Sequence, residues 1–500
     1  MTENYVVQAI AALQSGNFIA ARDFMRNRRS SSIEVRDYLI RGLAELSLKD
    51  WLAAKATFAE ACQHFPNEAQ LLFNLGTAQE NLGDLRNAVT SFERSLRARP
   101  DQGDACGNLS NLYCRLGRFD EAETMARRAI ELGVPRAQGL NSLGLALMRQ
   151  NKVPEAAKAF VEALDLEPDN GFVFSNLANL AVDQLAFESA WTFFAQARVV
   201  SCDAPIIRHH EGMARLLAGD YELGWLMYES RLDVPGALRI TPHCPRYKGE
   251  ALAGKKLLLL AEQGFGDAIQ FCRYAARLKD SGVELTWAVP KNLQRLFSGN
   301  VPGKVVSESE PLPHADFYLP ILSLPYALKK WHPKDAPPAP YLNPTSLFLA
   351  LPLGRKIGLV WSGSPTHERD FERSLPLNAF APLWNKVEAR FYAAFTGAGL
   401  DQITNEPIAR LDKYIKDFAD TAALLTQFNA LVTVDTAVAH LAGTLGVKTY
   451  LLLPYCPDWR WGTEGETTPW YPSMTLLRQT EPGNWSGVIA QLVERLAASA

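Results

Sequence analysis

NLGTAQENLGDLRNAVTSFERSLRARP, residues 74–100, is one copy of a pattern that recurs through the first half of this chain. A small residue returns every 34 positions, an alanine follows twelve positions later, and a packing residue lies four positions after that alanine. The small residues are Gly42, Gly76, Ser110, Gly144, Ala178 and Gly212. The alanines are Ala54, Ala88, Ala122, Ala156 and Ala190, and the packing residues are Phe58, Phe92, Ala126, Phe160 and Phe194. A period of this length predicts antiparallel helix pairs that stack, because one pair cannot bury its apolar face alone.

Prolines close several of the units, at Pro66, Pro100 and Pro168. Proline cannot continue the second helix of a pair, and the small residues let the first helix approach the second closely. The pattern is that of tetratricopeptide repeats. It predicts an α solenoid, a TPR superhelix of six to seven repeats, over residues 1–232.

The composition limits the class of protein. A chain of 500 residues predicts two or three domains, and its net charge of −3 argues against nucleic acid as a partner. We find neither an apolar run of about 20 residues nor a secretory signal, so we expect no membrane span and a cytoplasmic protein. The seven cysteines are scattered and favour reduced thiols. His209, His210, His243 and Cys244 form no tight pattern, so no metal is expected.

The pattern changes in the second half of the chain. Residues 233–254, rich in proline and glycine, are predicted to be a linker. Apolar strands then alternate with helical segments, which implies parallel sheets. The expected strands are 256–261, 284–289 and 317–320, followed by 356–361, 390–395, 430–434 and 448–453. They predict two Rossmann-like lobes, residues 255–343 and 344–500, and two such lobes with a cleft between them describe the GT-B plan.

The first motif is AEQGFGD, residues 261–267, at the end of the first expected strand. Gly264 and Gly266 permit a tight turn and a close backbone approach, and the N-terminus of the following helix favours negative charge. Asp267 therefore has two interpretations. It is either a helix-capping acid or a carboxylate that acts at the cleft as a general base or orients the substrate.

The second motif is VWSGSP, residues 360–365, which continues to two arginines. Ser362, Gly363 and Ser364 directly follow a strand, where α/β folds bind ligands. Backbone N–H groups, hydroxyls and the arginine forks can hold a diphosphate. Arg369 and Arg373 are the available cations, and the sequence does not choose between them. The alternative is a solvated charged loop.

The third motif is VDTAVAHLAG, residues 434–443. A strand delivers Asp435 and Thr436 to its carboxyl end, and a helix with free N–H groups starts at once near Ala437. His440 lies four residues after Thr436 and hence on the same helical face. Either it takes part in the site or it bonds a backbone group.

Together these motifs, with DFADTAAL (417–424) and PDWRW (457–461), resemble the tetratricopeptide-fused, heptosyltransferase-like bacterial glycosyltransferases of GT-B fold. The resemblance implies transfer of a sugar from a nucleotide-sugar, without a metal or another cofactor. It implies that Asp267 is the base and that the serine–glycine turn lies near the donor phosphates. It also implies that Asp435, Thr436 and His440 surround the sugar-nucleotide, with His440 grouped with Asp267 as a catalytic candidate.

Two departures from this family's pattern put activity and donor identity in doubt, rather than the fold. Position 437 is alanine where the heptosyltransferases often have glycine, and the added methyl group can crowd a phosphate. The segment FYAAFT, residues 391–396, replaces a more polar strand end. A nucleotide contact can be missing there.

Asparagines recur on the first helices of the repeats, at Asn74, Asn108, Asn111, Asn176 and Asn179. Residues three positions apart share a helical face, and these helices line the concave groove. The amides resemble the asparagine ladder of repeat-fused O-linked N-acetylglucosamine transferases, which implies a protein acceptor. The alternative is that asparagine is common at this position of such repeats for local reasons.

Three functions remain open from the sequence. The first is a protein glycosyltransferase whose repeats choose the acceptor, as in the repeat-fused enzymes that modify flagellins. The second is a transferase acting on a glycan or a lipid-linked sugar. The third is a repeat scaffold whose transferase half is inactive. Expected partners are a nucleotide-sugar and an acceptor protein, and self-association into a homo-oligomer is left open.

Overall fold

The computed structural model describes residues 2–27, 34–201, 203–234, 236–344, 349–365, 367, 369–397 and 399–498. Its internal contacts divide the chain into two compact units, Met1–Leu180 and Ala181–Ala500. Within the described ranges, no helix is long and apolar enough to cross a membrane. The domain boundaries expected near residues 232, 254 and 343 stay predictions.

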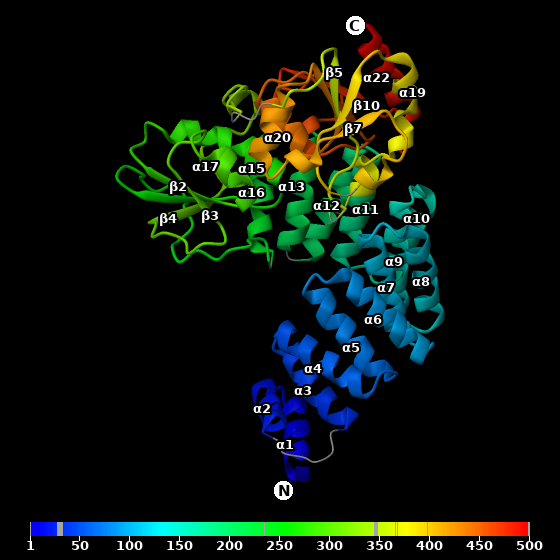
Figure 1. Ribbon diagram of the computed structural model, residues 1–500. Coiled ribbons are helices and arrows are strands. Elements are labelled where there is room, and N and C mark those ends of the chain that lie inside the picture. Colours follow the sequence, from blue (N-terminus) through cyan, green and yellow to red (C-terminus); the bar gives the residue numbers. More distant parts are fainter. Residues whose placement is uncertain are drawn as a thin grey trace. The chain divides into compact units, whose positions relative to one another are not determined.

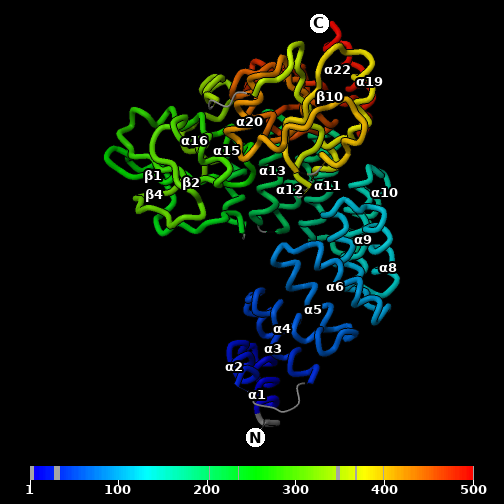
Figure 2. The backbone as a smooth tube through the Cα atoms, in the orientation of Figure 1, coloured from blue at the N-terminus to red at the C-terminus, as the bar shows by residue number. Residues whose placement is uncertain are grey.

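The first unit is a helical solenoid of antiparallel helix pairs, whose chain path can be followed in Figures 1 and 2. Its helices are α1 (Thr2–Gln14), α2 (Phe18–Arg26), α3 (Val35–Ser47), α4 (Trp51–His64), α5 (Ala69–Asn81), α6 (Leu85–Ala98), α7 (Gly103–Arg115), α8 (Phe119–Glu131), α9 (Arg136–Arg149) and α10 (Val153–Leu166). The boundary after Leu180 falls inside α11 (Gly171–Asp183), so Asp183 belongs to the second unit. The α solenoid predicted from the 34-residue period is confirmed.

Side-chain size at the repeat positions explains the close packing inside each pair. A methyl group added at Gly144 would lie 2.5–2.9 Å from three ring atoms of Phe160, so only glycine fits there. In the third copy both positions differ. Ser110 stands at the small position and Ala126 at the packing position, and the Ser110 hydroxyl donates to the Ala122 carbonyl at 2.9 Å. The larger first residue is thus matched by a smaller second one.

We predict that Gly144→Ala lowers the free energy of unfolding of the first unit by about 1–3 kcal/mol, because the methyl group overpacks against Phe160. Adding Phe160→Ala should make the effect of the alanine at 144 much smaller. Gly107→Ala is the matched control, since a methyl group there has no neighbour within 4 Å. Urea unfolding followed by circular dichroism measures the wild type, Gly144→Ala, Phe160→Ala, the double variant and Gly107→Ala. Equal midpoints for Gly144→Ala and Gly107→Ala would contradict this packing argument.

After the end of α11, the second unit continues with α12 (Phe187–Val200), α13 (Pro205–Leu217), α14 (Tyr221–Tyr228) and the 3-10 helix η1 (Glu229–Asp233). Gly212 of α13 packs directly on α14, because a methyl group there would lie 2.6 Å from the Tyr228 amide nitrogen. Trp225 of α14 is fully buried and donates its indole N–H to the Trp331 carbonyl at 2.9 Å. This last helix pair is therefore built into the α/β part of the unit.

A four-stranded parallel sheet follows, in the order β3-β2-β1-β4. Its strands are β1 (Lys256–Leu260), β2 (Glu284–Val289), β3 (Lys304–Ser307) and β4 (Phe317–Pro320). Its helices include α15 (Phe265–Phe271), the 3-10 helix η2 (Cys272–Leu278) and α16 (Lys291–Phe297). Leu257–Leu260 of β1 are buried on both faces, as expected of a central parallel strand.

A six-stranded parallel sheet follows, in the order β10-β9-β8-β5-β6-β7. Its strands are β5 (Lys356–Val360), β6 (Arg390–Ala393), β7 (Ile408–Arg410), β8 (Ala430–Val434), β9 (Thr449–Leu453) and β10 (Met474–Arg478). Helices beside it are α18 (Asp370–Arg373), α19 (Ala381–Lys386), α20 (Phe418–Leu425), α21 (Ala437–Thr444) and α22 (Ser486–Ala498). The second half of the chain is thus α/β with parallel sheets.

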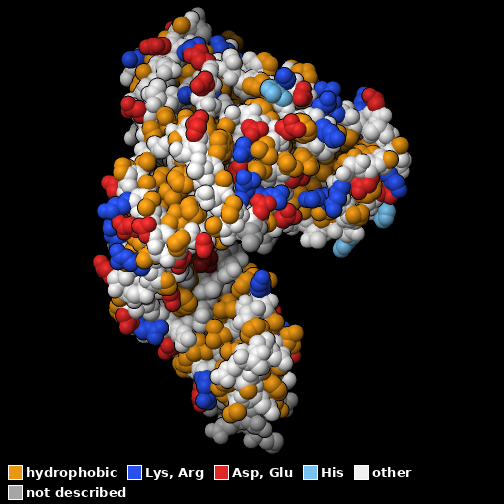
Figure 3. Space-filling model, turned by 180° about the vertical axis from the view of Figure 1, so that it is seen from behind, with side chains coloured by type: hydrophobic (Ala, Val, Ile, Leu, Met, Phe, Trp, Pro, Cys, Tyr) orange, Lys and Arg blue, Asp and Glu red, His pale blue; other side chains and the backbone are white. Residues whose placement is uncertain are grey.

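The two sheets are linked through their helices within this unit. Arg295 of α16 forms ion pairs with Asp417, at 2.7 Å, and with Asp420 at the start of α20. Phe265 of α15 packs on Phe418 of α20 with ring centroids 5.1 Å apart. On the face of the molecule in Figure 3, acidic and basic side chains lie interspersed.

Candidate functional site

The AEQGFGD segment forms a sharp turn between β1 and α15. Gln263 has a positive φ of 54°, a conformation that costs free energy for a residue with a Cβ atom. Gly264 is the N-cap of α15, and its N–H donates to Asp267 Oδ2 at 2.8 Å. Asp267 therefore caps its own helix, as one of its two interpretations requires. The helix starts at Phe265, so Asp267 lies in its first turn.

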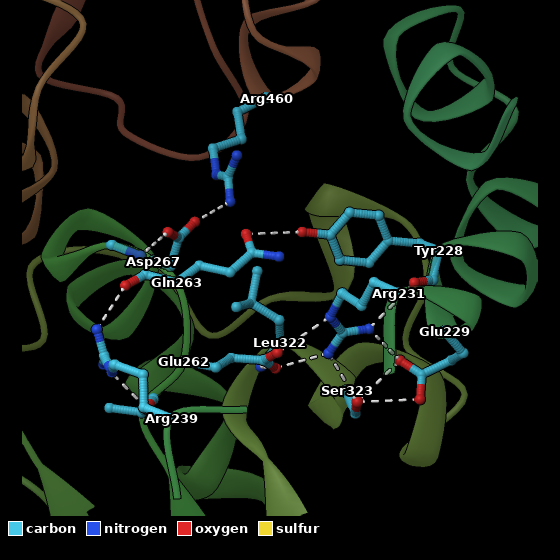
Figure 4. A network of polar contacts seen from close by, with 12 residues as sticks. Tyr228, Glu229, Arg231, Arg239, Glu262, Gln263, Asp267, Leu322, Ser323 and Arg460 are labelled. Carbon is cyan, nitrogen blue, oxygen red and sulfur yellow. Dashed lines mark hydrogen bonds and ion pairs between the residues drawn. The ribbon is translucent and has the colours of Figure 1, made fainter. Parts of the chain in front are cut away.

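The second oxygen of Asp267 connects the two sheets. Asp267 Oδ1 forms an ion pair with Nη2 of Arg460, which lies in the WRW segment after β9 (Figure 4). The same guanidinium donates through Nη1 to Asp458 Oδ1 at 2.8 Å and through Nε to Gln270 Oε1 at 2.7 Å. It lies 4.3 Å from the ring centroid of Trp459, a cation–π distance. Asp267 of the first motif thus pairs with Arg460, a residue to which no role was assigned from the sequence.

The third motif lies directly against the first. Asp435 follows β8, Thr436 is the N-cap of α21, and the helix begins at Ala437, as predicted. A methyl group added at Gly266 would lie 2.7 Å from His440 Cδ2 and 3.4 Å from Ala437 Cα. Glycine at 266 is therefore what lets the start of α15 approach the start of α21. The two helix starts, one beside each sheet, form a single polar centre.

His440 is buried inside that centre. Its Nδ1 lies 3.1 Å from the Tyr471 hydroxyl, and its ring stacks on Trp461 with centroids 5.2 Å apart. Nε2 lies 4.0 Å from Asp435 Oδ1. Burial, together with the nearby Arg460 charge, lowers the pKa of His440 to about 3. The imidazole is therefore neutral at physiological pH, and it bonds a tyrosine side chain rather than the backbone group that the sequence offered as an alternative.

Asp435 is an unusual carboxyl group. Burial and the neighbouring Asp458 raise the pKa of Asp435 to about 6, against the lowering effect of Arg373, the Trp461 indole and Arg460. Arg460 instead holds the pKa of Asp458 below its ordinary value, against the effect of burial. Carboxyl groups that titrate near neutrality can exchange protons in a reaction, and they occur often at functional sites.

The serine–glycine turn of the second motif follows β5. The Gly363 N–H donates to the Ser374 hydroxyl at 2.9 Å. A Cβ at 363 would lie 2.5 Å from Asp370 Oδ1 and 2.8 Å from Arg373 Nη2, so glycine is required for these side chains to lie over the turn. Ser362 and Ser364 flank this glycine. The segment is a folded turn with α18 lying over it.

The structure separates the two arginines that the sequence left equivalent. Arg369 pairs with Asp183 at the end of α11, at 2.9 Å, and with Glu372 at 2.6 Å. Arg373 pairs with Asp370 at 3.1 Å, and its charge lowers the pKa of both Asp435 and His440. Arg373 is therefore the arginine of this turn that acts on the polar centre.

A second network of polar contacts stabilises the turn between β1 and α15. Glu262, buried beside Gln263, accepts from Arg231 of η1 through both oxygens, at 3.1 and 2.6 Å (Figure 4). The Tyr228 hydroxyl donates to Gln263 Oε1 at 3.0 Å. The end of the last helix pair thus fixes the residues directly before Gly264. No local sequence signal links Arg231 to Glu262, whereas the arginine between two tryptophans in WRW is a signal that could have identified Arg460.

The asparagines predicted to bind an acceptor lie on first helices of the repeats. Asn176 donates to Asn141 Oδ1 at 2.8 Å, and Asn111 accepts from the Ser142 hydroxyl at 3.3 Å. Asn74 is buried, whereas Asn108 and Asn179 are partly exposed. Some of these amides therefore connect neighbouring repeats, and their binding of an acceptor stays a prediction. Asn141 is a member of this row that sequence reasoning missed.

We predict a pH dependence of stability from His440. The pKa of His440 in the folded protein, about 3, lies below the ordinary value near 6.5. Below pH 6.5 the unfolded chain therefore binds one more proton than the folded protein, and the free energy of unfolding decreases as the pH is lowered. Asp435 has the opposite effect between pH 6 and about 4, because its folded pKa is raised. Relative to His440→Gln, the wild type should lose about 2 kcal/mol of unfolding free energy between pH 7 and pH 5. Urea unfolding at both pH values measures this difference, and parallel curves would contradict the neutral imidazole.

Comparison with known proteins identifies the repeats. Residues 41–103 and 108–171 match the tetratricopeptide repeat family. Protein FlbA from Caulobacter vibrioides is 22% identical over 553 aligned positions, which cover 94% of this chain and 91% of FlbA. That similarity therefore extends beyond the repeats into the α/β half.

Two further similarities are partial. DnaJ homolog subfamily C member 7 from Homo sapiens is 24% identical over 56% of this chain and 54% of its own length. The crystal structure of a tetratricopeptide repeat protein from Parabacteroides merdae is 14% identical, covers 47% of this chain and 93% of its own, and gives a TM-score of 0.43. The first half of this chain consists of tetratricopeptide repeats, the class of repeat through which proteins bind other proteins.

Proposed function

We propose that the α/β half transfers a sugar from a nucleotide-sugar to a hydroxyl group of a protein, and that the repeats select that protein. The two parallel sheets would then be the lobes of a GT-B fold. The observation that carries this proposal is the meeting of the two helix starts, Gly264–Asp267 and Asp435–His440, with Arg460 and Arg373 beside them. Helix N-termini and arginines are the groups that bind phosphates.

The chemistry requires these groups in defined roles. The acceptor oxygen attacks the anomeric carbon of the sugar, and the bond from that carbon to the diphosphate oxygen breaks. The proton of the hydroxyl passes to a carboxylate, and the nucleoside diphosphate leaves with the bonding electrons. Cations and helix N–H groups that face the leaving oxygen stabilise its growing negative charge, which is usually the largest catalytic contribution. Asp267 is the proposed proton acceptor.

The acceptor is proposed to be a protein because the first half of the chain consists of tetratricopeptide repeats. Their partly exposed asparagines, such as Asn108 and Asn179, could bond the backbone of an extended peptide. Replacing Asn108, Asn111, Asn176 and Asn179 together should reduce transfer to the protein while donor hydrolysis by water is retained. Equal loss of both activities would remove the asparagines from acceptor binding.

One observation favours an inactive scaffold as a second candidate. Asp267 is paired with Arg460, and α15 packs against α21 so closely that Gly266 has no room for a methyl group. A scaffold whose lobes remain closed would show this same packing. Nucleotide binding separates the two functions, because only the transferase must admit a nucleoside diphosphate.

The test uses the full chain with UDP, GDP, CDP, ADP and dTDP in titration calorimetry. Binding of one of them, weakened by Arg373→Gln, supports the transferase. Arg410→Gln is the control, because Arg410 is the last residue of the edge strand β7 and forms an ion pair with Asp412. Absence of binding by all five would favour the scaffold. Intact-mass analysis of partner proteins, incubated with the matching nucleotide-sugar, then detects the transferred sugar.

A further inference from the structure

Arg460 has the environment of an anion-binding residue, but carboxylates of the protein occupy the place where an anion would bind its guanidinium. Its side chain is only 7% exposed, yet its guanidinium bonds Asp267 from one lobe and Asp458 from the other. Gln270 fixes Nε, and Trp459 covers one face of the guanidinium plane. A side chain held at this many points is pre-oriented, so little rotamer freedom remains to be lost when a ligand binds.

The charges around Arg460 limit how an anion can bind there. Asp267 and Asp458 already hold the guanidinium of Arg460, Asp435 adds a third carboxyl group to the centre, and His440 is neutral. A diphosphate that entered beside these carboxylates would be repelled. It can bind Arg460 if it takes the position of one of them, because a phosphate and a carboxylate present the same pair of oxygens to the guanidinium fork.

We propose that Arg460 binds the diphosphate of the donor, and that Asp267 occupies its place while no donor is bound. This inference rests on the proposed function and assigns a residue to it. Asp267 is the carboxylate that is displaced, because it lies on the opposite lobe, on α15. Asp458 lies two residues from Arg460 and bonds both its backbone N–H and its Nη1, at 3.0 and 2.8 Å.

The exchange would link donor binding to base activation. While Asp267 is paired with Arg460, its Oδ1 is held by the guanidinium and is not free to face an acceptor hydroxyl. When the diphosphate takes the guanidinium, the Asp267 carboxylate is released to receive the proton of the acceptor hydroxyl. As the anomeric carbon forms its bond to the acceptor oxygen, its bond to the diphosphate oxygen breaks. Arg460 then stabilises the negative charge that grows on the leaving diphosphate. The acceptor is thus not deprotonated before the donor is in place.

The experiment measures binding of inorganic pyrophosphate and of the same five nucleoside diphosphates by calorimetry. Asp267→Asn should bind them about threefold or more tightly than the wild type, because a competing occupant has been removed. Arg460→Gln should lose about 10- to 100-fold in affinity, the range expected for a lost charged hydrogen bond. Arg460→Lys should lie between them, since it keeps the charge without the fork. Arg410→Gln is the control and should match the wild type.

The outcomes separate this inference from the proposed function. If the wild type binds none of the probes, the proposed function and this inference both fail. If the wild type binds but Asp267→Asn and Arg460→Gln bind with the same affinity as it does, only the inference is overturned. Circular dichroism checks that each variant is folded. If Arg460→Gln does not fold, Asp267→Asn decides by comparison with Asp435→Asn, which removes a carboxyl group from the same centre. Displacement from Arg460 requires that Asp267→Asn tightens binding more than Asp435→Asn does, and equal tightening would overturn the inference.

Discussion

Asp267→Asn should reduce sugar transfer by about 10²- to 10⁴-fold, the contribution that general-base catalysis usually makes. Asparagine keeps the size and one acceptor oxygen, so the N–H of Gly264 still has a partner and α15 keeps its cap. It cannot take the proton of the acceptor. The rate is measured by intact mass of the acceptor protein, with the nucleotide-sugar that the titrations identify. We expect the loss in kcat, since binding of the donor is retained or tightened.

Asp435 provides the sharpest comparison for that experiment, because it is another carboxyl group of the centre and lies beside the neutral His440. Its pKa of about 6 would suit a base that works near neutral pH. If Asp267→Asn keeps wild-type turnover while Asp435→Asn loses it, the base is Asp435 and the assignment of Asp267 is wrong. Asp412→Asn, on the exposed pair with Arg410, is the matched control and should leave kcat unchanged.

The repeats could be predicted because their packing depends on side-chain sizes at fixed spacing. Gly144 and Phe160 complement each other, and Ser110 with Ala126 shows the same match in a different form. Neither observation needs contacts between distant parts of the sequence. The strand–turn–helix units of the second half were accessible for the same reason, since β1 and β8 are short, mainly apolar runs that end in a turn.

Of the four edge strands, β3, β7 and β10 were not predicted, whereas β4 was. β3 (KVVS) has only two apolar residues and β7 (IAR) has three residues in all, so neither shows the apolar run that marked β4 (FYLP). β10 is longer, but it follows the loop that contains Trp470 and Tyr471, where no periodicity marks a strand. These strands form because neighbouring strands offer them backbone partners, and that is a property of the sheet rather than of the local sequence.

The composition of the site was only partly accessible from sequence. Each motif was placed correctly at the end of its strand, but Asp267 and Arg460 are 193 positions apart and meet only through the packing of α15 on α21. The choice between Arg369 and Arg373 depends on Asp183, which belongs to a repeat helix. Long-range ion pairs are set by tertiary structure, and a single sequence contains no periodic signal for them.

Arg231→Met should lower the free energy of unfolding of the second unit by about 3–5 kcal/mol, because it leaves a buried carboxylate without its partner. The side chains of Arg231 and Glu262 are 4% and 2% exposed, so water cannot replace the lost bonds. Burial already raises the pKa of Glu262 despite Arg231, and without the guanidinium this carboxyl would be protonated or would draw water into the core. Urea unfolding followed by tryptophan fluorescence reports on this unit, where Trp225 and Trp459 pack together.

The double variant Arg231→Met with Glu262→Gln tests whether the loss comes from the unpaired charge. Removing both charges should restore part of the stability, because an uncharged pair no longer carries the cost of burying an ion. Arg410→Gln, which removes the exposed Arg410–Asp412 pair, should change the free energy of unfolding by less than about 1 kcal/mol, as is usual for surface pairs. A loss within that range for Arg231→Met would contradict a stabilising role of the buried Arg231–Glu262 pair. A loss of the expected size, accompanied by weaker nucleotide binding, would support a role of the last helix pair in the site. That helix pair would then hold the Gln263–Gly264 turn, and with it Asp267, in the position that the site requires.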